Sequence, residues 1–263
     1  MYFISELKTR NEPLCWFGLL CFAASLVFIV LSFRSSLLVA GVNAWYKPLK
    51  FALSIGIYCW TMGWFVHYLP KFNASLFNLT IILLLGFEIV YIALQAGRGQ
   101  LSHFNQSTPV YVILYRLMAI AATVVTLYTA YVGIEFFRQP VQLPAAYLNG
   151  IRAGIFIFVI FSLEGFVMGS RLSHTIGGTD GNHGIAFLGW SKRFGDPRVA
   201  HFIGMHALQV LPLLGWYVFR ESRWVWLTAA LYFLLALFTL VQALRGLPLF
   251  GKPSATVENS RQN

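Results

Sequence analysis

Apolar runs of about 20 residues alternate along the chain with short polar breaks. A helical run of that length crosses a hydrocarbon core of about 30 Å. Proline and polar residues mark the breaks, as at 70–73 and 139–144. We therefore predict an all-α polytopic membrane protein, a bundle of about seven transmembrane helices. The expected spans cover roughly residues 14–33, 49–69, 75–96, 109–137, 144–170, 199–220 and 223–247.

The composition supports a bilayer environment. The chain has 58% hydrophobic and 11% charged residues and a mean hydropathy of +0.68, whereas soluble domains carry about 25% charged residues. The formal charge of +10 comes from basic residues that stand singly at the ends of apolar runs. A phosphate backbone would need them in a block. We expect a lipid bilayer as the partner, and no nucleic acid.

One domain accounts for nearly the whole chain in this interpretation. We predict a single transmembrane bundle over residues 1–250 and a disordered polar tail over 251–263. Lys8 and Arg10 precede the first run, which is longer than the 7–15 residues of a signal-peptide core and is therefore kept as a span. Cys15, Cys21 and Cys59 lie inside apolar runs, where they suit packing rather than disulfides or thiolate metal sites.

Basic residues in the connections predict the orientation. Six lie on the side of the N-terminus and eleven on the other, while Arg116 and Arg152 inside spans complete the 19. The positive-inside rule then places the N-terminus outside and the C-terminus in the cytoplasm. For a bacterial protein this would be the inner, plasma membrane. Nothing in the pattern indicates an oligomeric state.

Two connections are longer than the others. Residues 34–48 contain Trp45, Tyr46 and Lys47 and are typical of an interfacial segment. Residues 171–198 hold a glycine-rich stretch, 177–184, followed by several basic residues. This stretch lacks the pattern of a phosphate-binding loop, so we predict a flexible lid rather than a phosphate site.

Ionisable side chains inside the predicted spans share a depth. With a rise of about 1.5 Å per residue, four of them lie about 9–13 Å below the face that carries the odd-numbered loops. Such charges are expensive in lipid and should face the bundle interior and one another. The predicted catalytic residues are these four: Glu88, Arg116, Glu164 and His206.

Further polar residues approach the same level. Glu88, Tyr91, Gln95 and Arg98 form a stripe along one face of the third span, and five of the six histidines fall at or near this side of the membrane, His183 among them. The predicted cofactor-binding residues are His103, His174, His201, Gln209, Arg98 and Lys50. The predicted metal ligands are Glu88, Glu164, His201 and His206, although His201 and His206 diverge by about 140° and do not form a chelating pair.

These residues leave three kinds of function open. The first is a metal- or haem-binding enzyme or redox protein that acts on a lipophilic or amphipathic small molecule. The second is a proton- or ion-coupled transporter, which the scarcity of polar groups toward the opposite face disfavours. The third is an assembly or sensory partner without catalysis. For single residues, a structural role competes: Glu88 or Glu164 paired with Arg116 would only fix helix packing.

Overall fold

The computed structural model describes residues 2–180 and 184–251. Within these residues, seven helices are long and apolar enough to span a membrane, which confirms the predicted all-α polytopic fold of an integral multi-pass protein. The orientation and the type of membrane stay predictions. The spanning segments are α2 (Glu12–Arg34), α3 (Tyr46–Val66), α4 (Ala74–Gly97), α5 (Pro109–Arg138), α6 with α7 (Ala145–Leu163 and Gly165–Arg171), α8 (Arg198–Tyr217) and α9 (Ser222–Leu244).

The chain forms two compact units, which we call unit 1 (Met1–Val141) and unit 2 (Gln142–Asn263) and describe separately. The expected single bundle over 1–250 stays a prediction. Of the expected disordered tail, residues 252–263 lie outside the described residues.

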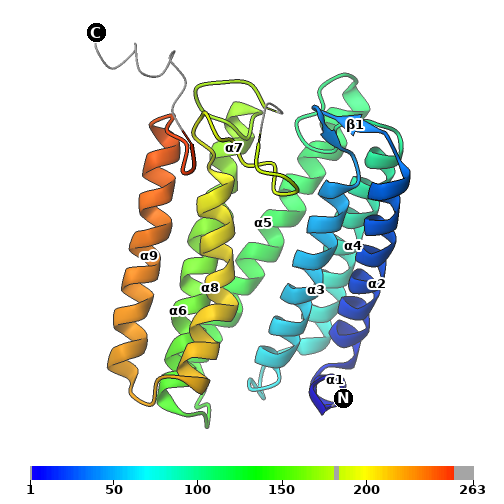
Figure 1. Ribbon diagram of the computed structural model, residues 1–263. Coiled ribbons are helices and arrows are strands. Elements are labelled where there is room, and N and C mark those ends of the chain that lie inside the picture. The colour runs from blue at the N-terminus through cyan, green and yellow to red at the C-terminus, as the bar shows by residue number, and fades with distance from the viewer. Residues whose placement is uncertain (1, 181–183, 252–263) are drawn as a thin grey trace. The chain divides into compact units, whose positions relative to one another are not determined.

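In unit 1, α2 packs along α3, and α4 packs against both α3 and α5 (Figure 1). A reciprocal pair of amide hydrogen bonds, each 3.0 Å, joins Asn11 at the start of α2 to Asn78 in α4. Both side chains are buried. In an apolar surrounding, such paired amides satisfy each other's donors and acceptors and so fix the register of the two helices.

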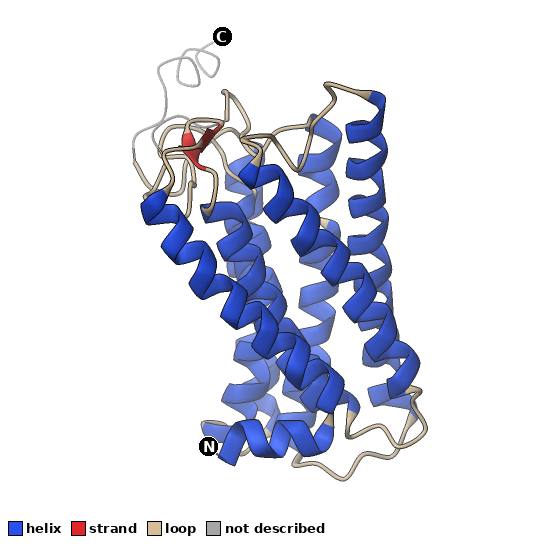
Figure 2. Ribbon diagram, turned by 90° about the vertical axis from the view of Figure 1, so that its right-hand side faces the viewer, coloured by secondary structure: helices blue, strands red, loops and turns tan. Residues whose placement is uncertain are grey.

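Unit 1 also contains two elements that the apolar runs did not predict. A short helix, α1 (Tyr2–Arg10), lies across the end of α2 (Figure 2), and its Phe3 stacks on Trp64 with ring centroids 5.3 Å apart. Between α2 and α3, strands β1 (Leu38–Val39) and β2 (Val42–Asn43) form a small hairpin. Its turn needs positive φ at Ala40 and Gly41. The predicted interfacial segment 34–48 is therefore folded.

Unit 2 is built on close contact between α6 and α8, with α9 packed beside them (Figure 1). Glycines allow this approach: a Cβ on Gly150 would lie 2.6 Å from the Leu211 carbonyl oxygen, and one on Gly154 would lie 2.7 Å from that of Ala207. In lipid, the hydrophobic effect does not drive helices together. They associate instead through close van der Waals contact, which small residues allow.

We predict that Gly154→Leu destabilises unit 2, because the added side chain must displace the backbone of α8. The expected cost is about 1–3 kcal/mol or more, measured as a lower midpoint for loss of the monodisperse peak when detergent-purified protein is heated. Phe156→Leu is the matched control, since it places leucine on the same helix at a side chain that is 64% exposed. Equal midpoints for the two variants would contradict the close packing of α6 and α8.

Candidate functional site

A groove of about 810 Å³ lies between α4 and α5 within unit 1. Most of its wall is apolar, and Gly86 also lines it. Along α4 it extends from Leu83 to Arg98, about 22 Å at the rise of an α-helix. The groove therefore reaches from the middle of a spanning helix to its end. The apolar wall consists of Leu83, Phe87, Val90 and Leu94 from α4 with Val110 and Leu114 from α5.

The other end of the groove is polar. Tyr91, Gln95 and Arg98 line it from α4, and Thr108 and Tyr111 line it from the start of α5. Three of the four residues of the predicted polar stripe thus share one cavity. Thr108 and Tyr111 were missed, although Thr108 followed by Pro109 is a recognisable helix start.

Local structure fixes this polar end. Helix α4 stops at Gly97, and Gly99 adopts the positive φ of 64° that ends the helix. Helix α5 begins with Pro109 in its first turn, and the Thr108 hydroxyl accepts a hydrogen bond from the Tyr111 amide at 3.3 Å. The two helix termini therefore hold Arg98 and Tyr111 on the two sides of the groove.

Two buried polar atoms at this end lack a partner. The Gln95 side chain is 1% exposed, and its Nε2 donates to the Leu101 carbonyl at 3.1 Å. Its Oε1 is left without a hydrogen bond among the described residues, as is the hydroxyl of Tyr91, which is 7% exposed. Both oxygens are enclosed by protein atoms, so a ligand in the groove does not reach them as they stand, and the Tyr91 hydroxyl is close enough to the Gln95 side chain for the two groups to satisfy each other.

The predicted catalytic residues of unit 1 do not pair. Glu88 is 6% exposed, whereas Arg116 is exposed, and no ion pair joins them within the described part of the chain. Arg116 therefore differs from the expectation that it faces the interior. Lys50, also in unit 1, is half-buried in α3. His103 contacts the Ser102 hydroxyl through Nδ1 at 3.1 Å and lies against the Phe51 ring.

Glu164 and His201 come together in unit 2. Glu164 stands at the break between α6 and α7, and its Oε2 lies 3.3 Å from His201 Nδ1. That nitrogen makes its hydrogen bond with the Phe161 carbonyl, at 2.7 Å. Because a carbonyl only accepts, Nδ1 donates in this contact, and in the neutral ring Nε2 is then the nitrogen with the lone pair. Both carboxylate oxygens of Glu164 are buried without a hydrogen bond among the described residues.

The other predicted residues of unit 2 do not extend this pair. His206 packs on Phe202, with ring centroids 4.4 Å apart, and Gln209 follows one turn later. Among the described residues, no group of three or more His, Cys, Asp or Glu is placed to hold a metal ion. Glu88 and Arg116 belong to unit 1, and Glu164 and His206 to unit 2. The meeting of all four therefore stays a prediction.

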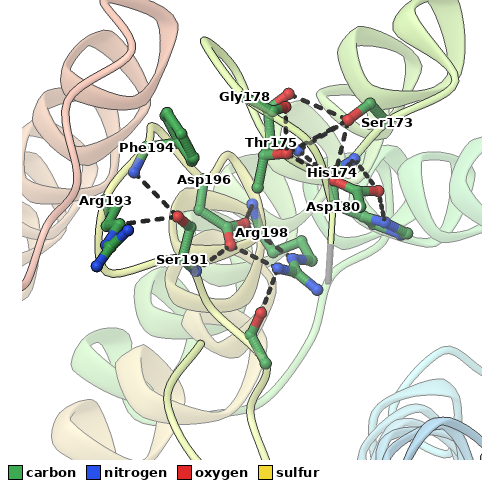
Figure 3. Close-up of polar contacts among 11 residues, drawn as sticks. Ser173, His174, Thr175, Gly178, Asp180, Ser191, Arg193, Phe194, Asp196 and Arg198 are labelled. Atoms are coloured by element: carbon green, nitrogen blue, oxygen red, sulfur yellow. Dashed lines mark hydrogen bonds and ion pairs between the residues drawn. The ribbon is translucent and has the colours of Figure 1, made fainter. Parts of the chain in front are cut away.

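The loop at 171–198 is held by two aspartates rather than open (Figure 3). Asp180 accepts hydrogen bonds from the backbone amides of His174 and Thr175, both at 2.9 Å, and from the hydroxyl of Ser173. His174 Nδ1 also lies 2.8 Å from Asp180 Oδ2. A carboxylate already occupies these amides, so in the described part of this loop they are not open to a phosphate, while the lid stays a prediction. His183 lies outside the described residues.

The second aspartate ties the loop to α8. Asp196 accepts from Arg198 Nε at 2.8 Å and from the Ser191 amide at 2.8 Å, and Arg198 also donates to the Gly189 carbonyl (Figure 3). Ile176 and Gly195 exchange backbone hydrogen bonds. The loop is thus a folded cover on the end of unit 2.

No family model, curated protein or solved structure matches this chain.

The hydrogen bonds of Asp180 predict how the stability of this loop depends on pH. Burial alone would raise the pKa of Asp180, but hydrogen bonds from His174 and Thr175 and the charge of His174 lower it below its usual 3.8. A lowered pKa means that the stabilisation is complete above pH 3.8 and is lost only as pH falls through the lower value of the folded protein. Hydrogen exchange should find the amides of His174 and Thr175 protected from pH 7 to about 4.

Asp180→Asn should remove most of this protection throughout that range, because a neutral amide is a weaker acceptor and offers only one acceptor oxygen. Glu221→Gln is the control, since Glu221 lies at the start of α9 and pairs only with the exposed Arg223 among the described residues. Unchanged exchange at His174 and Thr175 in Asp180→Asn would show that the carboxylate does not hold the loop.

Proposed function

We propose that unit 1 binds a lipid-soluble amphipathic molecule in the groove between α4 and α5. The observation that carries this proposal is the polarity of the groove. Apolar side chains line the groove along α4 from Leu83 to Leu94, and the polar side chains join them only from Tyr91 onward, where α4 ends and α5 begins. A molecule with an apolar tail and a polar head matches this order, with the tail at hydrocarbon depth and the head near the interface.

Energetics favour an amphiphile over a wholly apolar molecule. A tail gains contact with the groove wall but gains little hydrophobic free energy, because lipid is as apolar as the wall. The head supplies what lipid tails cannot, namely polar or charged contacts for the exposed Arg98 and the half-buried Tyr111. Binding would therefore be driven mainly at the polar end.

A second candidate function rests on His201 in unit 2. Histidines that ligate metals almost always donate their other ring N–H to a carbonyl or carboxylate. The Nδ1 of His201 has such a partner in the Phe161 carbonyl, with Glu164 beside it. We propose that His201 Nε2 ligates haem iron or a metal ion. The other ligands would be groups that do not contact His201 in this structure. This is the version of the redox or enzyme hypothesis that the contacts of unit 2 support.

Val90→Trp tests the groove. Val90 lines it and is 58% exposed, so tryptophan would fill the space that the tail needs. We expect lipid extracts of purified wild type to contain one amphiphile species at near-stoichiometric amount. The variant should retain about tenfold less, which corresponds to a loss of about 1.4 kcal/mol.

Leu79→Trp is the matched control because Leu79 lies on the same helix, is 57% exposed and is not part of the groove. It should retain the amphiphile as wild type does. Wild-type protein with no bound amphiphile above the detergent background, or equal retention by both variants, would refute the proposal.

The second candidate is tested by the visible spectrum and metal content of protein purified from cells supplied with haem and iron. His201→Ala should abolish any Soret band or stoichiometric metal, whereas His206→Ala, which changes a histidine packed on Phe202, should retain it. Wild type with neither a band nor bound metal would eliminate this candidate. Equal losses in both variants would show that the binding does not depend on His201.

A further inference from the structure

Helix α1 lies across the end of α2 instead of running along it (Figure 2). It belongs to neither proposed site, because none of its residues lines the groove and His201 is in the other unit. We propose that α1 is an interfacial helix that lies in the headgroup layer of the bilayer. Its flank at Ile4 faces the acyl chains, and its face at Ser5 and Thr9 points to water.

One face of α1 packs on the spanning helices. Phe3, Leu7 and Arg10 follow an i, i+4, i+7 spacing, so they fall within an arc of about 60° on the helix. Phe3 stacks on Trp64 of α3, and Leu7 is fully buried. The guanidinium carbon of Arg10 lies 4.0 Å from the Trp64 ring centroid. These contacts fix the rotation of α1 about its own axis.

Two tryptophans place α1 at the level of the membrane interface. Trp64 lies in the last turn of α3, and Trp16 lies in the second turn of α2. Trp16 is 53% exposed, and its Nε1 donates to Glu12 Oε1 at 3.2 Å. An indole with an exposed ring and a satisfied N–H near a helix end is typical of the aromatic belt between lipid and water. Because Phe3 stacks on Trp64, α1 is level with this belt.

The exposed sides of α1 differ in polarity. Ile4 is 42% exposed and shares a side of the helix with Lys8, four residues later. Since Lys8 Nζ lies 5.4 Å from the Trp16 ring centroid, this flank is on the side of Trp16. Ser5 and Thr9 are also exposed and lie about 100° and 140° round the helix from Ile4. An apolar flank beside a polar face is the pattern of a helix in the plane of the interface.

The charges of α1 predict no preference for anionic lipids. Arg10 pairs with Glu6 at 2.8 Å, and Lys8 pairs with Glu12 at 3.5 Å. Interfacial helices that depend on anionic lipids carry unpaired basic residues on their polar face, whereas each cation here has its own carboxylate. We therefore expect apolar contacts to hold α1 on zwitterionic and anionic membranes alike.

Site-directed spin labelling tests this position. Ile4→Cys and Thr9→Cys would each carry a nitroxide in the full chain, reconstituted into phosphatidylcholine vesicles. Collision with oxygen, which concentrates among acyl chains, is compared with collision with a water-soluble nickel chelate. The label at position 4 should favour oxygen, and the label at position 9 should favour nickel. The lipid and water references are Leu20→Cys, 64% exposed within the span of α2, and Lys71→Cys, exposed in a connection.

Two controls complete the design. Unsubstituted protein treated with the label gives the background, because Cys15, Cys21 and Cys59 are each at most 2% exposed. Trp16→Cys, on the same flank, carries the same expectation as Ile4→Cys and replaces it if that variant does not fold. Adding phosphatidylglycerol to the vesicles should leave the ratio of the two collision rates unchanged at both positions.

Three results would overturn the proposal. A flank label that behaves like the Lys71→Cys reference would show that this side of α1 is in water. A flank label shielded from both reagents would show that protein, such as a second copy of the chain, covers it. An oxygen preference that appears only with phosphatidylglycerol would show that headgroup charge, rather than apolar contact, holds α1 on the membrane.

Discussion

The cost of an unsatisfied polar group in hydrocarbon is the constraint on which this structure depends. Because the hydrocarbon core contains no water, every backbone amide and every buried polar side chain needs a hydrogen-bond partner within the protein. The chain meets this demand with helices and with paired side chains such as Asn11 and Asn78. Against that background, a buried polar atom without a partner is informative. The two carboxylate oxygens of Glu164 are such atoms, and a local arrangement of this kind carries more weight than ionisable groups that merely share a depth.

The spanning segments could be predicted because the length and composition of an apolar run are enough to identify a membrane span. The same reasoning missed α1, whose nine residues are too polar to span and are held by contacts such as that of Phe3 with Trp64. It also did not anticipate the hydrogen bonds that hold the described part of the loop at 171–198. Glycine content suggested freedom, whereas Asp180 and Asp196 each accept hydrogen bonds from two backbone amides of the described residues. A carboxylate's partners are set by how the chain folds back, and spacing does not reveal them.

The candidate site was partly predictable for the same reason. Helical periodicity alone places Tyr91, Gln95 and Arg98 on one face of α4, and the groove contains all three. Periodicity gives no information about which helix faces that stripe. The contribution of Thr108 and Tyr111 therefore required the structure, as did the separation of Glu88 from the exposed Arg116. Depth along a helix is a one-dimensional quantity, whereas a site needs the rotation of each helix as well.

The two candidate sites differ in what their unsatisfied atoms require. At the groove, the Tyr91 hydroxyl and Gln95 Oε1 are enclosed and within reach of each other, so the exposed Arg98 is the polar group that a ligand in this space can contact. At Glu164, the unsatisfied oxygens are buried beside His201, and the Phe161 carbonyl already takes the imidazole proton. A carboxylate in that position is best placed to polarise the imidazole, which strengthens Nε2 as a ligand. The groove is therefore suited to binding an entire ligand molecule. The pair of Glu164 and His201 is suited to adjusting how strongly one nitrogen, His201 Nε2, binds a metal.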